Sequence, residues 1–215
     1  MAAPVQVKIC GLTSPQGVAD ALRAGARYLG INFFPPSPRY LAPEAARALA
    51  LDIPEGIAKV GLVVDASDDL LDGLTSVVPL DMLQLHGHES VARVAEVKAR
   101  YSLPVIKVVG IADADDLTVL ETYLGVADQI LVDAKPPRDA VLPGGNGLRF
   151  DWRLVAGRRW PCPWMLAGGL TPANVAEAIR LTGARQVDVA SGVESAPGVK
   201  DAALMAAFVA AAQAA

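Results

Sequence analysis

The sequence predicts an α/β protein of the (β/α)8 TIM-barrel class, with residues 1–215 forming a single domain. Eight short runs rich in β-branched residues alternate with eight helical segments, and 215 residues suit one such barrel. The first run ends in Cys10-Gly11-Leu12-Thr13 rather than in a G-x-G-x-x-G loop. That ending argues against the alternative fold, an open doubly wound sheet with a dinucleotide site.

The predicted strands are short and are bounded by turn residues. They cover residues 5–9, 28–33, 59–64, 81–85, 104–109, 129–132, 164–167 and 186–190. Helices are predicted to begin at Ser14-Pro15, Pro43-Glu44, Ser67, His88-Glu89-Ser90, Asp113, Phe150-Asp151-Trp152, Thr171-Pro172 and Val199. The long Pro- and Gly-rich connection between residues 135 and 149 is then the loop after the sixth strand.

Composition excludes several classes of function. Hydrophobic residues make up 53% of the chain, which is enough for a large core. The net charge of −4 lacks the excess of basic residues that is typical of proteins that bind nucleic acid. No apolar run approaches the roughly 20 residues of a membrane span. The two cysteines are too few for a disulfide scaffold, and the first residues lack a signal-peptide pattern. We therefore expect a cytoplasmic protein that binds no membrane.

Active sites of such barrels lie at the C-terminal ends of the strands, and Cys10 ends the first of them. The alternative is that Cys10 is a small buried hydrophobe. A thiol on the floor of a pocket can act as a general base or a nucleophile. Cys162 lies between two prolines ahead of the seventh strand, at the opposite end, and is interpreted as structural.

Asp133 directly follows the apolar sixth strand. Its alternative role is that of a helix cap or turn residue. If this carboxyl is partly buried and short of counter-charge, its pKa rises and it can hold a proton for general acid catalysis. Cys10 and Asp133 are thus predicted to face each other across one pocket.

Two glycine-containing loops follow the seventh and eighth strands and predict a phosphate site. The residues concerned are Gly168, Gly169, Ser191 and Gly192, and Gly145 belongs to a further glycine loop that can fold over the same phosphate. Glycine allows the backbone to approach an anion, and helix N-termini favour negative charge. The alternative is that these loops are ordinary tight turns.

Arg39 lies in a proline-stiffened loop after the second strand, where its guanidinium can bind a carboxylate, although it can equally be a solvated surface residue. His86 is either a substrate contact or a histidine that supports one. Asp65 is either a cap for the third helix or a ligand-binding residue. Three further residues are interpreted as structural or exposed: His88, Lys135 and Asp188. No metal-ligand spacing and no nucleotide fingerprint occur, so no metal or cofactor is expected.

As a set, these motifs resemble the phosphoribosylanthranilate isomerase family over nearly the whole chain. The matching segments are residues 8–13, 34–40, 84–87, 131–133, 144–152, 166–170, 187–194 and 197–201. The resemblance implies a barrel enzyme of tryptophan biosynthesis, without metal or cofactor, that performs an Amadori rearrangement of N-(5-phosphoribosyl)anthranilate. It implies Asp133 as general acid, Cys10 as general base, Arg39 on the anthranilate carboxylate, and the two glycine loops on the phosphate.

Two positions depart from the family pattern: Ala190 where Ser is frequent, and Asn146 where Ser or Thr is usual. Other interpretations stay open, namely another phosphosugar enzyme or a non-catalytic sensor of a phosphorylated ligand. An epimerase should show metal ligands at the strand ends, and a dual-specificity isomerase should show Asp in place of Cys10. We expect this protein to bind a small phosphorylated substrate and to be a monomer or a homodimer.

Overall fold

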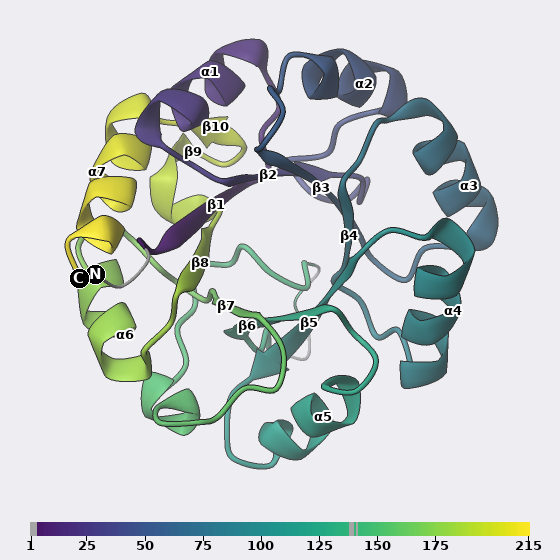
Figure 1. Cartoon of the computed structure of the whole chain (residues 1–215). Coiled ribbons are helices and arrows are strands. Elements are labelled where there is room, and N and C mark those ends of the chain that lie inside the picture. The colour runs from purple at the N-terminus through teal and green to yellow at the C-terminus, as the bar shows by residue number, and fades with distance from the viewer. Residues whose placement is uncertain (1–3, 138–139, 141) are drawn as a thin grey trace.

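Eight parallel strands close into a barrel in which each strand pairs with its neighbour in the sequence and β8 pairs with β1. The computed structural model describes residues 4–137, 140 and 142–215. Figure 1 looks along the barrel, with the helices on the outside. The strands are β1 (Gln6–Cys10), β2 (Tyr28–Asn32), β3 (Ala58–Val63), β4 (Met82–Leu85), β5 (Val105–Ile111), β6 (Gln129–Ala134), β7 (Trp164–Leu166) and β8 (Gln186–Val189). The predicted (β/α)8 class is confirmed.

Helices follow the strands in the predicted alternation, with one exception. They are α1 (Pro15–Ala24), α2 (Pro43–Leu51), α3 (Asp68–Val77), α4 (Val91–Tyr101), α5 (Asp116–Tyr123), α6 (Val175–Thr182) and α7 (Ala202–Gln213). After β6 the predicted helix is a single 3₁₀ turn, Trp152–Val155. This short turn still buries Trp152 and Val155, so it covers the barrel at that position as a helix would.

Serine side chains set three of the predicted helix starts. The hydroxyl oxygens of Ser14, Ser67 and Ser90 each accept a hydrogen bond from the backbone N–H three residues later. The last helix begins at Ala202, not at Val199 as predicted, because Asp201 provides its cap by accepting from the N–H of Leu204.

The helix start predicted at Thr171-Pro172, after the seventh strand, is wrong, because the helix there, α6, begins at Val175. The side chain of Asn174 accepts from the Thr171 N–H at 2.8 Å and donates to the Gly169 carbonyl at 3.0 Å. These two bonds hold residues 171–174 in a turn ahead of the helix.

A second difference follows β8. The sequence interpretation placed the 191–194 segment at a helix N-terminus, but only a 3₁₀ turn, Ser191–Val193, stands there. It leads into a short antiparallel hairpin formed by β9 (Glu194–Ala196) and β10 (Val199–Lys200). This hairpin packs at the C-terminal end of the barrel, where Glu194 contacts Arg39 in the pocket lining.

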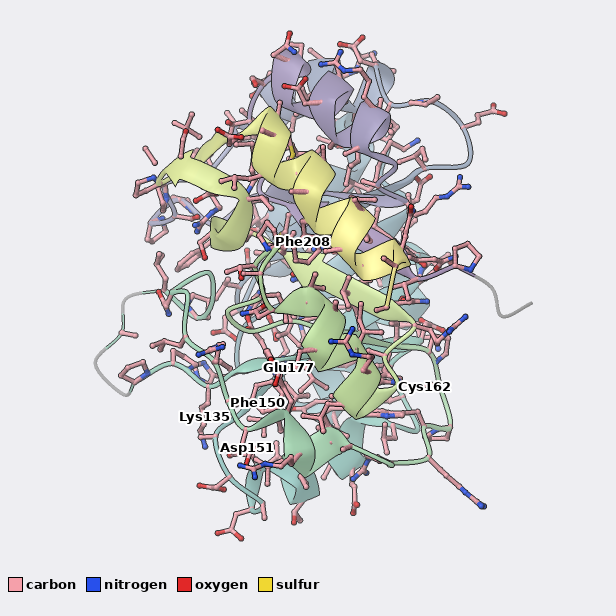
Figure 2. All side chains as sticks on the ribbon, turned by 90° about the vertical axis from the view of Figure 1, so that its left-hand side faces the viewer. Lys135, Phe150, Asp151, Cys162, Glu177 and Phe208 are labelled. Atoms are coloured by element: carbon pink, nitrogen blue, oxygen red, sulfur yellow. The ribbon has the colours of Figure 1, made fainter. Side chains whose placement is uncertain are left out.

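Two apolar layers hold the barrel. The larger one fills the space between strands and helices and includes Phe208 on α7, which is fully buried and is labelled in Figure 2. The smaller one fills the barrel itself, with side chains that alternate along the strands. Its members are Val60, Ile106, Val108, Leu131, Met165 and Ala167. Toward the C-terminal ends of the strands this inner layer gives way to polar side chains.

Candidate active site

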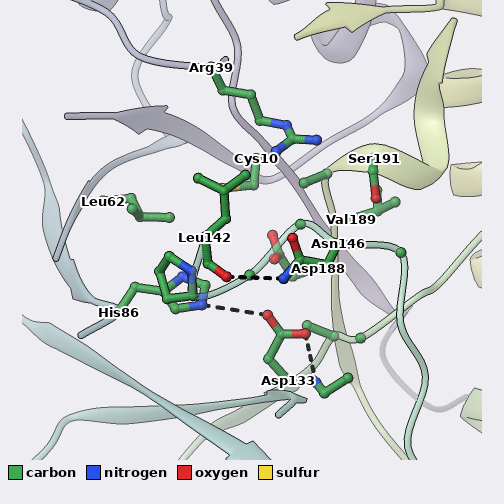
Figure 3. A pocket seen from close by; sticks show the side chains of 18 of the residues that line it. Cys10, Arg39, Leu62, His86, Asp133, Leu142, Asn146, Asp188, Val189 and Ser191 are labelled. Atoms are coloured by element: carbon green, nitrogen blue, oxygen red, sulfur yellow. Dashed lines mark hydrogen bonds and ion pairs between the residues drawn. The ribbon is translucent and has the colours of Figure 1, made fainter. Parts of the chain in front are cut away.

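The polar end of the barrel opens into a pocket of about 780 Å³, mouth included. A pocket of this size suits a small-molecule ligand. All nine residues that the sequence predicted for the site line it: Cys10, Arg39, His86, Asp133, Gly145, Gly168, Gly169, Ser191 and Gly192. Figure 3 shows Cys10 and Asp133 on opposite sides of this space.

Asp133 lies inside β6, one residue before its end, and not in a turn after the strand. It is 8% exposed, and its Oδ1 accepts a hydrogen bond from the Ala134 N–H at 2.7 Å. The other oxygen, Oδ2, lies 3.5 Å from Nε2 of His86. The second ring nitrogen of His86 lies 3.2 Å from Nε2 of Gln84. The carboxyl is therefore held by its own strand, with a histidine beside the oxygen that faces the pocket (Figure 3).

Cys10 ends β1 and is 4% exposed. Burial raises the pKa of its thiol above the ordinary value, while the nearby Lys8 ammonium acts to lower that pKa. Lys8 itself is fully buried and donates to Oδ1 of Asp188 at 2.9 Å. Asp188, interpreted from the sequence as structural, also lines the pocket. The thiol thus adjoins a buried ion pair.

Arg39 is 6% exposed and is not a solvated surface residue. Its Nε and Nη2 each donate at 2.8 Å to the carboxylate of Glu194, on β9. Lys200, on β10, donates to the same carboxylate at 2.7 Å and to the Ala190 carbonyl at 2.9 Å. Both carboxylate oxygens of Glu194 therefore accept hydrogen bonds from these two cations, which fixes the orientation of the guanidinium. The donors to Glu194 are Nε and Nη2 of Arg39, and Nη1 is not one of them.

The loop after β6 crosses the pocket and touches both of its walls. A side-chain carbon at Gly144 would lie 2.7 Å from the His86 ring and 2.8 Å from Oδ2 of Asp133. One at Gly145, where φ is +73°, would lie 2.6 Å from Nη1 of Arg39. A side chain at either position would have to displace the pocket side chains beneath it, because the backbone passes directly over the Asp133 carboxyl and the Arg39 guanidinium.

The loops after β7 and β8 pack against each other. Gly168 and Gly169 have φ values of +84° and +62°, which favour glycine. A side-chain carbon at Gly192 would lie only 1.9 Å from the Leu170 carbonyl oxygen. With Ser191, these residues bring backbone from two adjacent strands to one edge of the pocket. Such a backbone cradle suits an anion, although the α-helix after β7 begins further along the chain than predicted.

The remaining candidates lie outside the pocket lining. His88 is exposed, with a side chain 97% accessible, and Lys135 forms an ion pair with Asp116. Asp65 is no cap for α3, since Ser67 fills that role, and its Oδ1 accepts from the His88 N–H. Cys162 lies at the opposite end of the barrel from Lys135, as Figure 2 shows.

Residues 4–137, 140 and 142–215 contain no group of three or more His, Cys, Asp or Glu side chains arranged to hold a metal ion. Across the same residues, no helix combines the length and apolar character needed to cross a membrane.

Sequence reasoning assigned no role to three charged residues around the pocket, namely Lys8, Glu194 and Lys200. The only signal for Lys8 was its spacing of two from Cys10, which places both side chains on one face of β1. Glu194 and Lys200 stand in recognised motifs, but nothing in the sequence indicates that both contact Arg39.

Comparison with known proteins agrees with this geometry. The family model described as N-(5′-phosphoribosyl)anthranilate (PRA) isomerase matches residues 7–211. The N-(5′-phosphoribosyl)anthranilate isomerase of Cereibacter sphaeroides is 64% identical over 212 residues, covering 98% of this chain and 100% of that protein. The enzyme of that name from a Ruegeria species is 61% identical over 213 residues, covering 99% of each chain.

Solved structures extend the comparison to the fold. The phosphoribosylanthranilate isomerase of Thermotoga maritima is 34% identical and superposes with a TM-score of 0.86, covering 98% of this chain and 100% of that one. A second isomerase structure, in complex with reduced 1-(o-carboxyphenylamino)-1-deoxyribulose 5-phosphate, is 32% identical with a TM-score of 0.85 and the same coverage. On these identities and coverages, the chain belongs to the phosphoribosylanthranilate isomerase family of enzymes.

Proposed function

We propose that this enzyme converts N-(5-phosphoribosyl)anthranilate into 1-(2-carboxyphenylamino)-1-deoxyribulose 5-phosphate in tryptophan biosynthesis, with Asp133 as general acid and Cys10 as general base. The observation that carries the proposal is the placement of these two groups on opposite walls of one pocket. A related isomerase that binds a reduced form of this product supports the choice of substrate.

Asp133 begins the reaction by donating its proton to the ribose ring oxygen. The bond between that oxygen and C1′ breaks, and the lone pair of the anthranilate nitrogen forms a C=N bond, which gives an iminium ion. The opened sugar gains a hydroxyl, and Asp133 is left as a carboxylate. Its anchored oxygen, bonded to the Ala134 N–H, keeps the other oxygen directed into the pocket beside His86.

Cys10 then removes the proton from C2′. The iminium ion acidifies this proton, so a thiolate is a sufficient base. The electrons of the broken C–H bond form a C1′=C2′ bond, those of the C=N bond return to nitrogen, and the resulting enolamine becomes the ketone by moving a proton from the C2′ hydroxyl to C1′. A positioned acid and a positioned base each contribute about 10²–10⁴-fold to such a step.

Binding of the two anionic ends of the substrate is assigned to different parts of the pocket. Arg39, held by Glu194, directs its remaining donors to the anthranilate carboxylate, and this preorganisation limits the entropy lost on binding. The backbone of Gly168, Gly169, Ser191 and Gly192 holds the phosphate, with Gly145 in the loop that covers both.

The test is a fluorescence assay of substrate loss with purified protein, run on Cys10→Ala, Asp133→Asn and the matched control Cys162→Ala. We expect turnover to fall by about 10²–10⁴-fold in each pocket variant, with unchanged calorimetric binding of the reduced product analogue. Cys162→Ala should behave as wild type. Normal turnover in Cys10→Ala or Asp133→Asn would refute the assigned roles, and no turnover by the wild-type protein would refute the function.

Arg39→Ala tests the carboxylate contact separately. Because Arg39 binds a group that does not react, its loss should raise KM more than it lowers kcat. An unchanged KM would show that the anthranilate carboxylate binds elsewhere in the pocket.

A further inference from the structure

A charged side chain is enclosed within the barrel directly beside the proposed base. Lys8 is fully buried and is one of the largest side chains with no contact to solvent. It pairs across the β1–β8 ladder with Asp188, and its Nζ donates to Oδ1 of that residue at 2.9 Å. An apolar pair at such a position is often at least as stable as a buried ion pair, so packing alone does not explain these charges.

The fold brings the Lys8 ammonium close to the Cys10 thiol. The two residues are two apart on β1, so both side chains point into the barrel. Gly30 on β2 pairs with Cys10 and has no side chain. A carbon at that position would lie 2.9 Å from Sγ of Cys10 and 3.2 Å from Nζ of Lys8. Sulfur and nitrogen therefore border the same small space, which the glycine leaves open.

We propose that Lys8 is a positioning residue that stabilises the thiolate form of Cys10, and that the Asp188 carboxylate moderates its effect. This inference rests on the proposed role of Cys10 as the base. Lys8 remains an ammonium ion throughout the reaction and exchanges no proton with the substrate. Its contribution is electrostatic, since it increases the fraction of the enzyme in which Cys10 is ready to accept the C2′ proton.

Four charged groups face the thiol from the elements packed around it: Lys8 on β1, Asp188 on β8, Lys200 on β10 and Arg39 after β2. Burial raises the pKa of Cys10, Lys8 lowers it, Asp188 raises it, and Lys200 lowers it by less than Lys8 does. Burial also acts to lower the pKa of Lys8, but Asp188 and Cys10 raise it overall, so the ammonium stays charged.

Lys200 and Arg39 act on the thiol less directly, because both are engaged by the Glu194 carboxylate at 2.7–2.8 Å. Lys8 has only Asp188 as a carboxylate partner in the described part of the chain. Lys8 is therefore the cation best placed to stabilise a negative charge on Cys10.

The experiment measures the thiol itself. Wild type and variants, all in a Cys162→Ser background, are treated with iodoacetamide over a range of pH, and the rate of alkylation at Cys10 is followed by mass spectrometry. The thiolate sulfur displaces iodide, so the rate follows the fraction of thiolate. Lys8→Met should shift this titration upward by roughly 1–2 pH units, while Asp188→Asn should shift it downward.

These opposite directions separate the proposal from a purely structural role, which would not move the titration in opposite senses. In Lys8→Met, kcat should fall about tenfold or more with little change in KM, since each unit of pKa reduces the thiolate fraction tenfold. Lys107→Met is the matched control, because Lys107 is also a buried lysine paired with a carboxylate, Glu89, but lies on β5 and is not among the charged groups that act on Cys10. It should leave the Cys10 titration unchanged.

Lys8→Met leaves Asp188 buried without a partner, which can prevent folding. The comparison of Asp188→Asn with Lys8→Met/Asp188→Asn avoids this, because neither protein contains that unpaired carboxylate. The double variant should titrate at higher pH than Asp188→Asn. Equal titrations in this pair, or shifts of Lys8→Met and Asp188→Asn in the same direction, would overturn the role of Lys8. Normal turnover in Cys10→Ala would instead refute the proposed role of Cys10 as the base. The measured effect of Lys8 on the thiol titration would remain valid in that case.

Discussion

Replacing Glu194 by Gln should weaken substrate binding and stability together. In the wild type its carboxylate accepts from Arg39 at 2.8 Å through each oxygen and from Lys200 at 2.7 Å, with side chains no more than 7% exposed. A neutral amide leaves two buried cations without a counter-charge. Breaking a buried pair costs about 3–5 kcal/mol, which for a domain of this size lowers Tm by roughly 10 °C.

The loss of Glu194 also releases Arg39 from its fixed orientation. The substrate carboxylate then has to order this side chain on binding, so KM should rise by roughly tenfold, equivalent to about 1.4 kcal/mol, with a smaller change in kcat. Steady-state kinetics by substrate fluorescence and thermal unfolding by circular dichroism measure the two effects separately.

Glu89→Gln is the matched control. This carboxylate is similarly buried and pairs with Lys107 at 2.8 Å, but neither residue lines the pocket. It should lower Tm by a comparable amount and leave KM unchanged. If Glu89→Gln raises KM as much as Glu194→Gln does, or if folded Glu194→Gln binds substrate normally, the positioning of Arg39 by Glu194 is refuted.

Three further outcomes are expected. Gly192→Ala should raise KM at least roughly tenfold, because the added carbon would lie 1.9 Å from the Leu170 carbonyl oxygen and must displace the proposed phosphate loop; an unchanged KM would refute that site. Burial acts to raise the pKa of Glu194, but Arg39 and Lys200 hold it below 4.5, so this residue stabilises the fold above that pH and loses its contribution as pH falls through the folded-state pKa. Acid titrations of unfolding free energy should therefore be steeper for wild type than for Glu194→Gln, and parallel curves would contradict this. Cys162→Ser should leave kcat and KM unchanged, since that thiol lies at the far end of the barrel, and a lower kcat would show otherwise.

The strands and four of the eight helix starts were predictable because local signals determine them. Each predicted run overlaps a strand, α1 and α3 begin after Ser14 and Ser67 as expected, and α4 begins at the end of the predicted His88-Glu89-Ser90 start. The β9–β10 hairpin was not predictable, because its strands have three and two residues and depend on contacts such as that of Lys200 with Glu194. The start of α6 was missed because the Asn174 side chain forms hydrogen bonds with Thr171 and Gly169 in the preceding loop. The helix therefore does not begin at the Thr171-Pro172 pair, although such a pair is typical of a helix start.

The part of the site that lies at the C-terminal ends of the strands was predictable from the sequence. In a parallel barrel the C-terminal ends of all strands share one face, so Cys10 and Asp133 had to lie near one pocket once their strands were recognised. Their partners were not predictable in this way. Lys8 and Asp188 are 180 positions apart, and Arg39 and Glu194 are 155 apart. No local pattern specifies which charge meets which across such a separation.

These pairings explain how an acidic chain, with a net charge of −4, forms a site suited to an anion. Beside Cys10, Lys8 and Asp188 neutralise each other, whereas Arg39 and Lys200 share the single carboxylate of Glu194. This cluster therefore carries one positive charge in excess, held away from water, where its interaction with a nearby anion is stronger than at the surface. Because the excess charge lies on Arg39 and Lys200, it favours the proposed binding of the substrate carboxylate, while the proposed stabilisation of a Cys10 thiolate comes mainly from Lys8.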